Sequence, residues 1–185
     1  MSHRGRLMVA TPLIGDSNFE RSVVLLLAHG PDGAFGVVLN RPSDVPAAHV
    51  VPDWDGGVAA PAVVFLGGPV EPERVIGIGR IGNHPALPSV GGFHPLLGNY
   101  DTVDLDGPPP PVADEISGVR LFAGSAGWAP GQLEDEIREG AWWPCDAGPT
   151  DVATTDPSGL WCRVLRRQPG EVAWFANHPA DPSQN

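Results

Sequence analysis

Five polar and aromatic residues could form an anion-binding site if the fold brings them together. Asn40 and Arg41 follow an apolar run, at the end of a predicted strand where polar side chains can face a cleft. An arginine there can hold a carboxylate or phosphate through two parallel hydrogen bonds. Arg21 would add a second cation, Trp128 an apolar wall and Gln132 an adaptable amide. The competing interpretation is structural: Asn40 and Arg41 bond to a turn, and Trp128 packs in the core.

Two glycine-containing motifs resemble reactive signatures but lack the required context. Residues 77–82 satisfy GxGxxG after a predicted strand, yet the proline-containing segment 83–88 cannot open the helix that a dinucleotide site needs. Residues 123–127 approximate a nucleophile elbow around Ser125, but the next predicted helix begins about five residues later. A nucleophilic serine also needs a positioned base, and nothing in the sequence places His178 beside it. A small-residue turn is the better interpretation of 123–127.

The histidines show no spacing typical of a metal site. Zinc sites favour tight pairs such as HxxxH or CxxC, and the six histidines are scattered. His84 and His94 share one predicted loop, which is weak support for a metal. We therefore expect no metal and no cofactor.

The charge balance argues against direct nucleic-acid binding. The 185-residue chain carries a net charge of −11, and all eleven of its basic residues are arginines. Binding to a phosphate backbone normally rests on clustered cations. The densest cluster, Arg163, Arg166 and Arg167, lies on one predicted helix and is typical of a solvated face. A small anionic ligand or a protein partner is the better expectation.

Cysteine usage and hydropathy predict a cytoplasmic protein. Cys145 and Cys162 form no disulfide framework in a chain of this length. The longest aliphatic run, Val23 to Ala28, has six residues, whereas a membrane span needs about 20. We expect two reduced thiols and no membrane segment.

The predicted elements are short, because 24 glycines and 22 prolines interrupt the chain. Apolar runs predict strands at residues 6–10, 22–28, 34–39, 62–66, 75–81, 101–105, 119–122 and 142–143. The turn at residues 29–33 predicts a hairpin between the second and third of these strands. Helices are expected at 43–51, 130–139 and from Asp156 onward. Residues 83–99 are expected to form a loop, and 108–111 a polyproline connector.

The order of these elements favours an α+β fold. Strands and helices do not alternate regularly, which argues against a doubly wound sheet. The length fits one domain spanning residues 1–185, with an irregular C-terminal tail from about residue 169.

Four blocks in the right order resemble the YqgE/AlgH family of uncharacterised bacterial proteins. They are Met8-Val9-Ala10-Thr11-Pro12 with Phe19 and Arg21 to Leu27, Gly36 to Pro42, Gly67-Gly68-Pro69-Val70, and Phe122 to Trp128 with Gly131 to Glu134. The ending from Leu165 resembles the actinobacterial branch. Ser125 departs from the pattern, because the family usually carries Tyr there, which argues further against a nucleophilic serine.

The resemblance implies an α+β fold with a small closed β-barrel, or a mixed sheet, flanked by short helices. It also singles out Glu134, which the family motif retains beside Gln132; Glu134 otherwise belongs to an acidic helix face with Asp135, Glu136 and Glu139. The family has a transcriptional-regulator label and no established catalytic activity. A label or a fold does not by itself carry function.

Three hypotheses follow. The first is a non-enzymatic binding or regulatory protein with a candidate ligand site at Arg21, Asn40, Arg41, Trp128, Gln132 and Glu134. The second is an enzyme, most plausibly a hydrolase, that acts on a small anionic substrate in the same cleft. The third, a direct DNA-binding regulator, is disfavoured by the net charge and by the lack of a recognisable helix-turn-helix.

Overall fold

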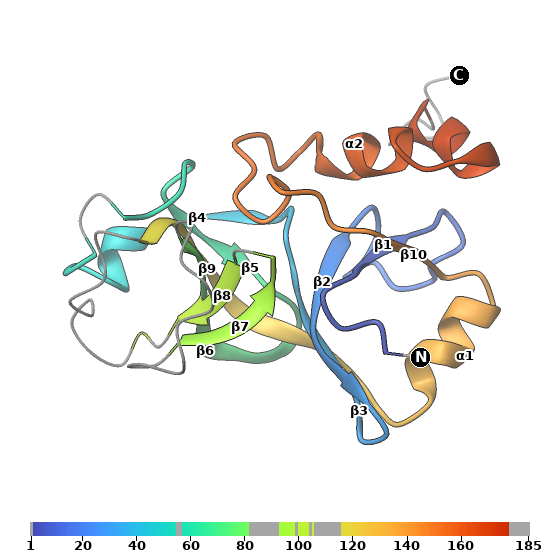
Figure 1. The fold of residues 1–185 in the computed structure, drawn as a ribbon, viewed down its shortest axis with the longest axis horizontal. Coiled ribbons are helices and arrows are strands. Elements are labelled where there is room, and N and C mark those ends of the chain that lie inside the picture. Colours follow the sequence, from blue (N-terminus) through green and yellow to red (C-terminus); the bar gives the residue numbers. More distant parts are fainter. Residues whose placement is uncertain are drawn as a thin grey trace.

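Strand β9 (Ile116–Trp128) is shared by the two halves of one mixed sheet (Figure 1). The computed structural model describes residues 2–54, 57–81, 93–98, 100–103, 105 and 116–177. The last residues of β9 pair with β3 (Gly33–Val38), and the sheet continues through β2 (Val23–Gly30) and β1 (Leu7–Ala10) to β10 (Trp142–Cys145). We call this antiparallel part the N-terminal half-sheet.

The earlier residues of β9 belong to a second part, the central half-sheet. One edge of β9 pairs antiparallel with β6 (Val70–Ile81), which continues through β8 (Tyr100–Val103) to β7 (Phe93–Leu97). The other edge pairs in parallel with β5 (Val63–Leu66), whose partner is β4 (Pro42–Pro46). The parallel pair makes the sheet mixed.

The predicted α+β fold with a mixed sheet is confirmed, and the closed barrel is wrong. Within the described residues the strand order runs from β10 to β7, and these two end strands do not pair. The sheet stays open because β9 changes partners part-way along its length. The two halves therefore diverge from β9 instead of curving back onto each other (Figure 1).

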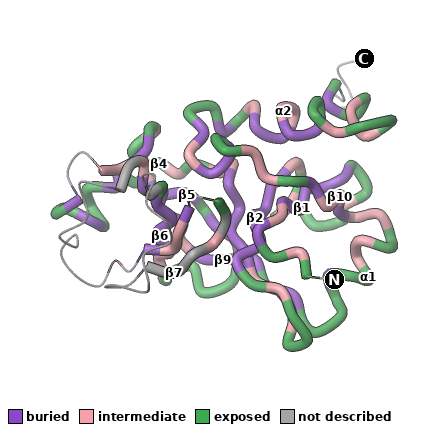
Figure 2. The backbone as a smooth tube through the Cα atoms, in the orientation of Figure 1, coloured by how far each residue is buried: buried purple, intermediate pink, exposed green. Residues whose placement is uncertain are grey.

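Both faces of the N-terminal half-sheet are buried, which explains its uninterrupted apolar runs. Alternate residues such as Leu7, Val9 and Leu25 pack with α2 (Leu160–Arg166). The intervening residues, among them Met8 and Val24, pack with Leu133 of α1 (Gln132–Arg138). The backbone in Figure 2 is accordingly buried along β1 and β2. One helix on each face thus fixes the register of the sheet.

Four predicted elements differ in the structure. Residues 123–128 continue β9 because they keep ladder pairing with β3 and β6, where a turn was expected. The expected helix at 43–51 begins as strand β4 up to Pro46 and continues as the short 3₁₀ helix η1 (Ala47–His49), since Pro46 interrupts a regular helix. Strand β7 lies within the expected loop 83–99. The described part of the tail predicted to be irregular forms the 3₁₀ helix η3 (Gly170–Asn177).

Several other predictions fall where the structure is not described. The proline stretch 108–111, most of the loop 83–92, and the side chains of His84, His94 and His178 lie outside the described residues. Among the helices that are described, none has the length and apolar character needed to cross a bilayer.

Glycines let the chain cross β9 at the point where it changes partners. The Gly67–Gly68 segment between β5 and β6 passes directly over Gly124 and Ser125. A Cβ on Gly68 would lie closer than 3.0 Å to the carbonyl group of Ser125, and one on Gly124 equally close to the carbonyl oxygen of Gly68. Both glycines also have positive φ, 148° and 72°. We call this contact the glycine crossing; it requires residues without a side chain.

Candidate functional site

Arg41 lines a crevice of about 190 Å³ beside the glycine crossing, which we call the Arg41 crevice. Its wall includes Gly68 and Pro69 from the β5–β6 connection and Pro72 from the start of β6. The Nη2 of Arg41 donates to the backbone oxygens of Glu20 at 3.1 Å and Ser17 at 3.4 Å. No carboxylate of the described residues pairs with this guanidinium. The two carbonyls therefore orient Arg41 without neutralising it.

Asn40 and Arg21 make structural contacts beside this crevice. The Oδ1 of Asn40 accepts the backbone N–H of Val23, and its Nδ2 donates to the backbone oxygen of Arg21, both at 2.9 Å. The Arg21 guanidinium lies 4.2 Å from the ring centroid of Trp161 on α2, and its Nη2 lies 3.4 Å from the Sγ of Cys162. Asn40 thus clamps the start of β2, and Arg21 packs onto α2.

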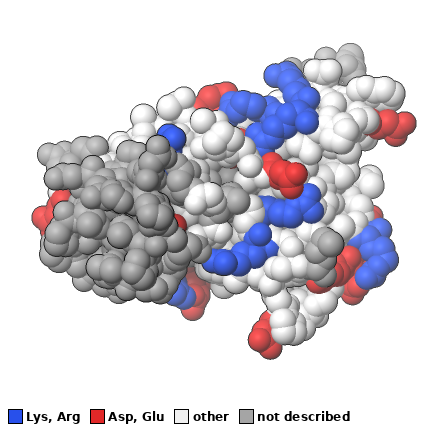
Figure 3. All heavy atoms as spheres, in the orientation of Figure 1, with Lys and Arg blue, Asp and Glu red and all other residues white. Residues whose placement is uncertain are grey.

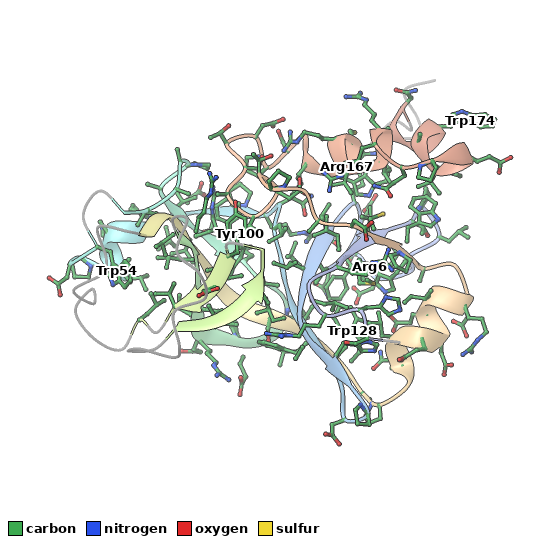
Figure 4. The ribbon with its side chains drawn as sticks, in the orientation of Figure 1. Arg6, Trp54, Tyr100, Trp128, Arg167 and Trp174 are labelled. Carbon is green, nitrogen blue, oxygen red and sulfur yellow. The ribbon has the colours of Figure 1, made fainter. Side chains whose placement is uncertain are left out.

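Trp128 and Gln132 converge on Glu136, a residue that the sequence did not single out. One carboxylate oxygen, Oε2, accepts the indole N–H of Trp128 and that of Trp142, each at 2.8 Å. The other oxygen accepts the Gln132 amide at 2.8 Å, while Gln132 itself accepts the backbone N–H of Ala129. The sequence did contain one indication of this contact: Gln132 and Glu136 are four residues apart on a predicted helix and therefore lie on the same face. This arrangement fastens the helix to the sheet; Trp128 is labelled beside α1 in Figure 4.

Glu134 pairs with a histidine on the β2–β3 hairpin. The Nε2 of His29 lies 2.9 Å from Oε1 of Glu134, and Nδ1 of His29 accepts the backbone N–H of His3 at 2.8 Å. Since Nδ1 accepts, Nε2 carries the proton and donates to Glu134. A hydrogen bond to its own backbone N–H, and then the contact with His29, lower the pKa of the Glu134 carboxyl. Both ring nitrogens of His29 therefore have hydrogen-bond partners.

The six candidate residues therefore fall into two groups. Arg21, Asn40 and Arg41 surround the start of β2, whereas Trp128, Gln132 and Glu134 lie on or beside α1. Phe19 connects the groups: its ring stacks on Trp128 with centroids 6.4 Å apart, and its turn supplies the carbonyls that hold Arg41.

Ser125 is placed as a packing residue. It is 4% exposed, and its hydroxyl donates to the backbone oxygen of Val70 at 3.5 Å, within the glycine crossing. Residues 77–81 of the GxGxxG motif lie in β6, and its last glycine lies outside the described residues.

Arg120 is a second charged residue that the sequence analysis missed. It is fully buried in β9, and its Nη2 donates to the backbone oxygens of Ala60 at 2.8 Å and Thr154 at 3.0 Å. The guanidinium lies 4.2 Å from the ring centroid of Phe65. Burial lowers its pKa to about 10, so it remains charged at neutral pH. The sequence did contain an indication of this role, because Arg120 is a single arginine within a predicted apolar strand. It joins three segments of chain.

Comparison with known proteins gives the family. A model of the AlgH-like family, DUF179, matches residues 7–173. A UPF0301 protein of Streptomyces coelicolor is 46% identical over 98% of this chain and 94% of its own, and one of Thermobifida fusca is 44% identical over 100% and 96%.

Solved structures agree. A Corynebacterium diphtheriae crystal structure covers 94% of this chain and 91% of its own at 35% identity, with a TM-score of 0.86. The solution structure of the AlgH protein from Pseudomonas aeruginosa shares the fold, with a TM-score of 0.67 at 24% identity over 98% and 96% of the two chains. The chain belongs to the AlgH-like family, for which no specific function is established.

Proposed function

We propose that this protein is a non-enzymatic binding protein with a regulatory role, and that it recognises a small anionic ligand through Arg41. The observation that carries the proposal is the hydrogen bonding of the Arg41 guanidinium. Among the residues that the structure describes, two carbonyls hold Nη2 and no carboxylate in the crevice pairs with the guanidinium. Nε and Nη1 remain to receive an anion.

The walls of the Arg41 crevice support a ligand with a small apolar part. Pro69 and Pro72 form rigid apolar surfaces, and Leu66 is 52% exposed beside them. The volume of about 190 Å³ suits a metabolite-sized group. An anionic side chain or C-terminus of a protein partner carries the same chemistry, and the test below separates it from a free metabolite.

The described residues offer less to a hydrolase. Ser125 is buried with its hydroxyl on a carbonyl, and both nitrogens of His29 have partners. A nucleophile needs an adjacent base, and these two groups do not form such a pair. We keep the hydrolase as the alternative and direct DNA binding as the disfavoured third.

The test is thermal unfolding of the wild type and Arg41→Gln with a panel of metabolites, nucleotides, short acidic peptides and duplex DNA. A ligand at a hundred times its Kd adds about 2.7 kcal/mol, which raises the Tm of a domain of this size by roughly 5–11 °C. We expect one anionic compound to raise the Tm of the wild type but not that of Arg41→Gln.

The matched control is Arg138→Gln on the exposed surface of α1, where Arg138 pairs with Asp135. It should keep the shift. A shift that survives Arg41→Gln would contradict the proposal. A shift with acidic peptides alone would assign the crevice to a protein partner, and one with DNA alone would favour the third hypothesis.

We also propose a cytoplasmic location. The support is that Cys145 and Cys162 are both free thiols, as expected in a reducing compartment. Cell fractionation tests this, and recovery of the protein outside the cytoplasm would contradict it.

A further inference from the structure

A larger cavity of about 770 Å³ opens where the two half-sheets diverge. It begins one residue beyond the Arg41 crevice along the chain: Pro72 lines the crevice, and Glu73 lines the cavity. Its walls come from β2, β3, β6 and β8 and from the residues after η1. We call it the inter-sheet cavity.

The walls of the inter-sheet cavity combine polar and apolar surface, and part of the apolar surface is incompletely covered. Five apolar side chains that line it are only half-buried: Phe35, Val75, Ile76, Leu96 and Leu105. Val75 and Ile76 remain so because β8 pairs with β6 only from Gly77 to Arg80, which leaves the preceding β6 residues without β8 beside them. Half-covered apolar surface gathered in one concavity is the ordinary lining of a small-molecule site.

Two arginines reach this cavity. Arg4 donates its Nε to the backbone oxygen of Leu27 at 3.1 Å, which holds the guanidinium against the β2 wall. Arg74 lines the cavity from β6 and forms an exposed ion pair with Glu71 at 3.3 Å. Glu73 is the one carboxylate among the described lining residues. The described lining residues therefore include two arginines and one carboxylate, although the whole chain carries a net charge of −11.

The surface leading to the cavity is basic as well. Arginine side chains are gathered on the face shown in Figure 3, over α2 and across β1 and β10 toward the half-sheet junction. Arg6 and Arg167, labelled in Figure 4, both contact Asp146: the Arg6 Nε lies 3.2 Å from its Oδ1, and Nη2 of Arg167 donates to its backbone oxygen at 2.9 Å. Arg167 also pairs with Asp151, so acidic residues among these arginines offset part of their charge.

We propose that the inter-sheet cavity binds an amphipathic anion, with an apolar chain or ring against the walls and one carboxylate or sulfonate against Arg4 and Arg74. The volume lies within the range of about 300–1,000 Å³ typical of small-ligand pockets, which favours a small molecule over a protein segment. The charge of the lining selects an anion over a neutral lipid. This site is separate from the Arg41 crevice and does not depend on it.

The test uses the fluorescence of 8-anilinonaphthalene-1-sulfonate, followed by competition with decanoate and with decanol. We expect the wild type to bind the dye at one site, decanoate to displace it, and decanol to displace it at least tenfold less well. Arg4→Gln with Arg74→Gln should raise the Kd of both anions at least tenfold. These arginines are exposed, and circular dichroism with a cooperative thermal transition will show that the variant is folded.

Two further variants locate the site. Ile76→Trp should fill the cavity and remove binding of the dye, whereas Arg138→Gln and Arg41→Gln should leave its Kd within twofold of the wild type. Displacement by decanol as effective as that by decanoate would overturn the assignment of an anion. So would unchanged dye binding in the double arginine variant. Loss of dye binding in Arg41→Gln alone would move the site to the crevice.

Discussion

Glu136 on α1 and Arg41 beside the glycine crossing are both half-buried charged groups, and they have different roles in the structure. Both oxygens of Glu136 are occupied, by two indoles and one amide. Arg41 uses one of its three nitrogens, and its partners are carbonyls. A charged side chain whose polar atoms all have hydrogen-bond partners stabilises the structure. One that keeps unused N–H donors beside a crevice can bind a ligand. The following predictions test this contrast.

The largest effect should come from the glycine crossing, which forms the wall of the Arg41 crevice. Gly68→Ala places a Cβ against the backbone of Ser125 at a φ that a side chain rarely adopts, so we expect a loss of about 4 kcal/mol or more in the free energy of unfolding. Urea denaturation measures it. Gly15→Ala, with no atom within 4 Å of its Cβ, should change stability by about 0.5 kcal/mol or less. Equal effects of the two variants would show that the crossing is not tight.

The next effect should come from Glu136. Glu136→Ala leaves the indole N–H groups of Trp128 and Trp142 without an acceptor, and both rings are at least nine-tenths buried. We expect a loss of about 2–3 kcal/mol and a change in tryptophan emission. Glu139→Ala is the matched control, because Glu139 is exposed on the same helix end. If Glu136→Ala were as stable as Glu139→Ala, the contrast with Arg41 would fail.

The sequence predicted the N-terminal half-sheet well because its signals are local. Continuous apolar runs at 6–10, 22–28 and 34–39, with a glycine turn between the last two, correspond to β1, β2 and β3. The central half-sheet was predicted less well. Gly124 indicated a turn, but it lies within a strand because the backbone of Gly68 and Val70 approaches it closely. Such approaches are long-range and leave no local pattern.

The candidate site shows the same division. The sequence identified Asn40, Arg41, Trp128 and Gln132 as polar or aromatic groups at the ends of elements. It could not say that Asn40 bonds to the backbone of residues 21 and 23, or that Trp128 and Gln132 share a third partner. It also gave no sign of the inter-sheet cavity, since Arg4, Phe35 and Arg74 are far apart along the chain.

A smaller effect should distinguish Arg21 from Arg41. Arg21→Ala removes the contact with Trp161, for a loss of about 1 kcal/mol. Arg21 has a φ of 52°, so Arg21→Gly should be about 1 kcal/mol more stable than Arg21→Ala, because glycine tolerates that conformation. Thermal and urea unfolding measure both. Neither variant should abolish a ligand shift that Arg41→Gln abolishes; if one does, Arg21 belongs to the binding site.

The smallest effect concerns the edge of α1 that faces the N-terminus. Burial, and then the neighbouring Arg6 and His29, lower the pKa of His3 below its ordinary value of 6.5. The unfolded chain therefore binds more protons than the folded protein near that pH, and the contribution of His3 to stability is lost as the pH falls below 6.5. The lowered pKa of Glu134 acts in the same direction below about 4.5, its ordinary value.

The measurement is the free energy of unfolding between pH 8 and pH 4. His3→Asn should flatten the profile below pH 6.5, and Glu134→Gln should flatten it only below about 4.5. Glu134 is exposed, so its effect should be smaller than that of Glu136→Ala at any pH, although the two carboxylates are two residues apart on one helix. A larger effect at Glu134 would mean that the pair with His29, and not the bonds to the two indoles, fastens α1 to the sheet.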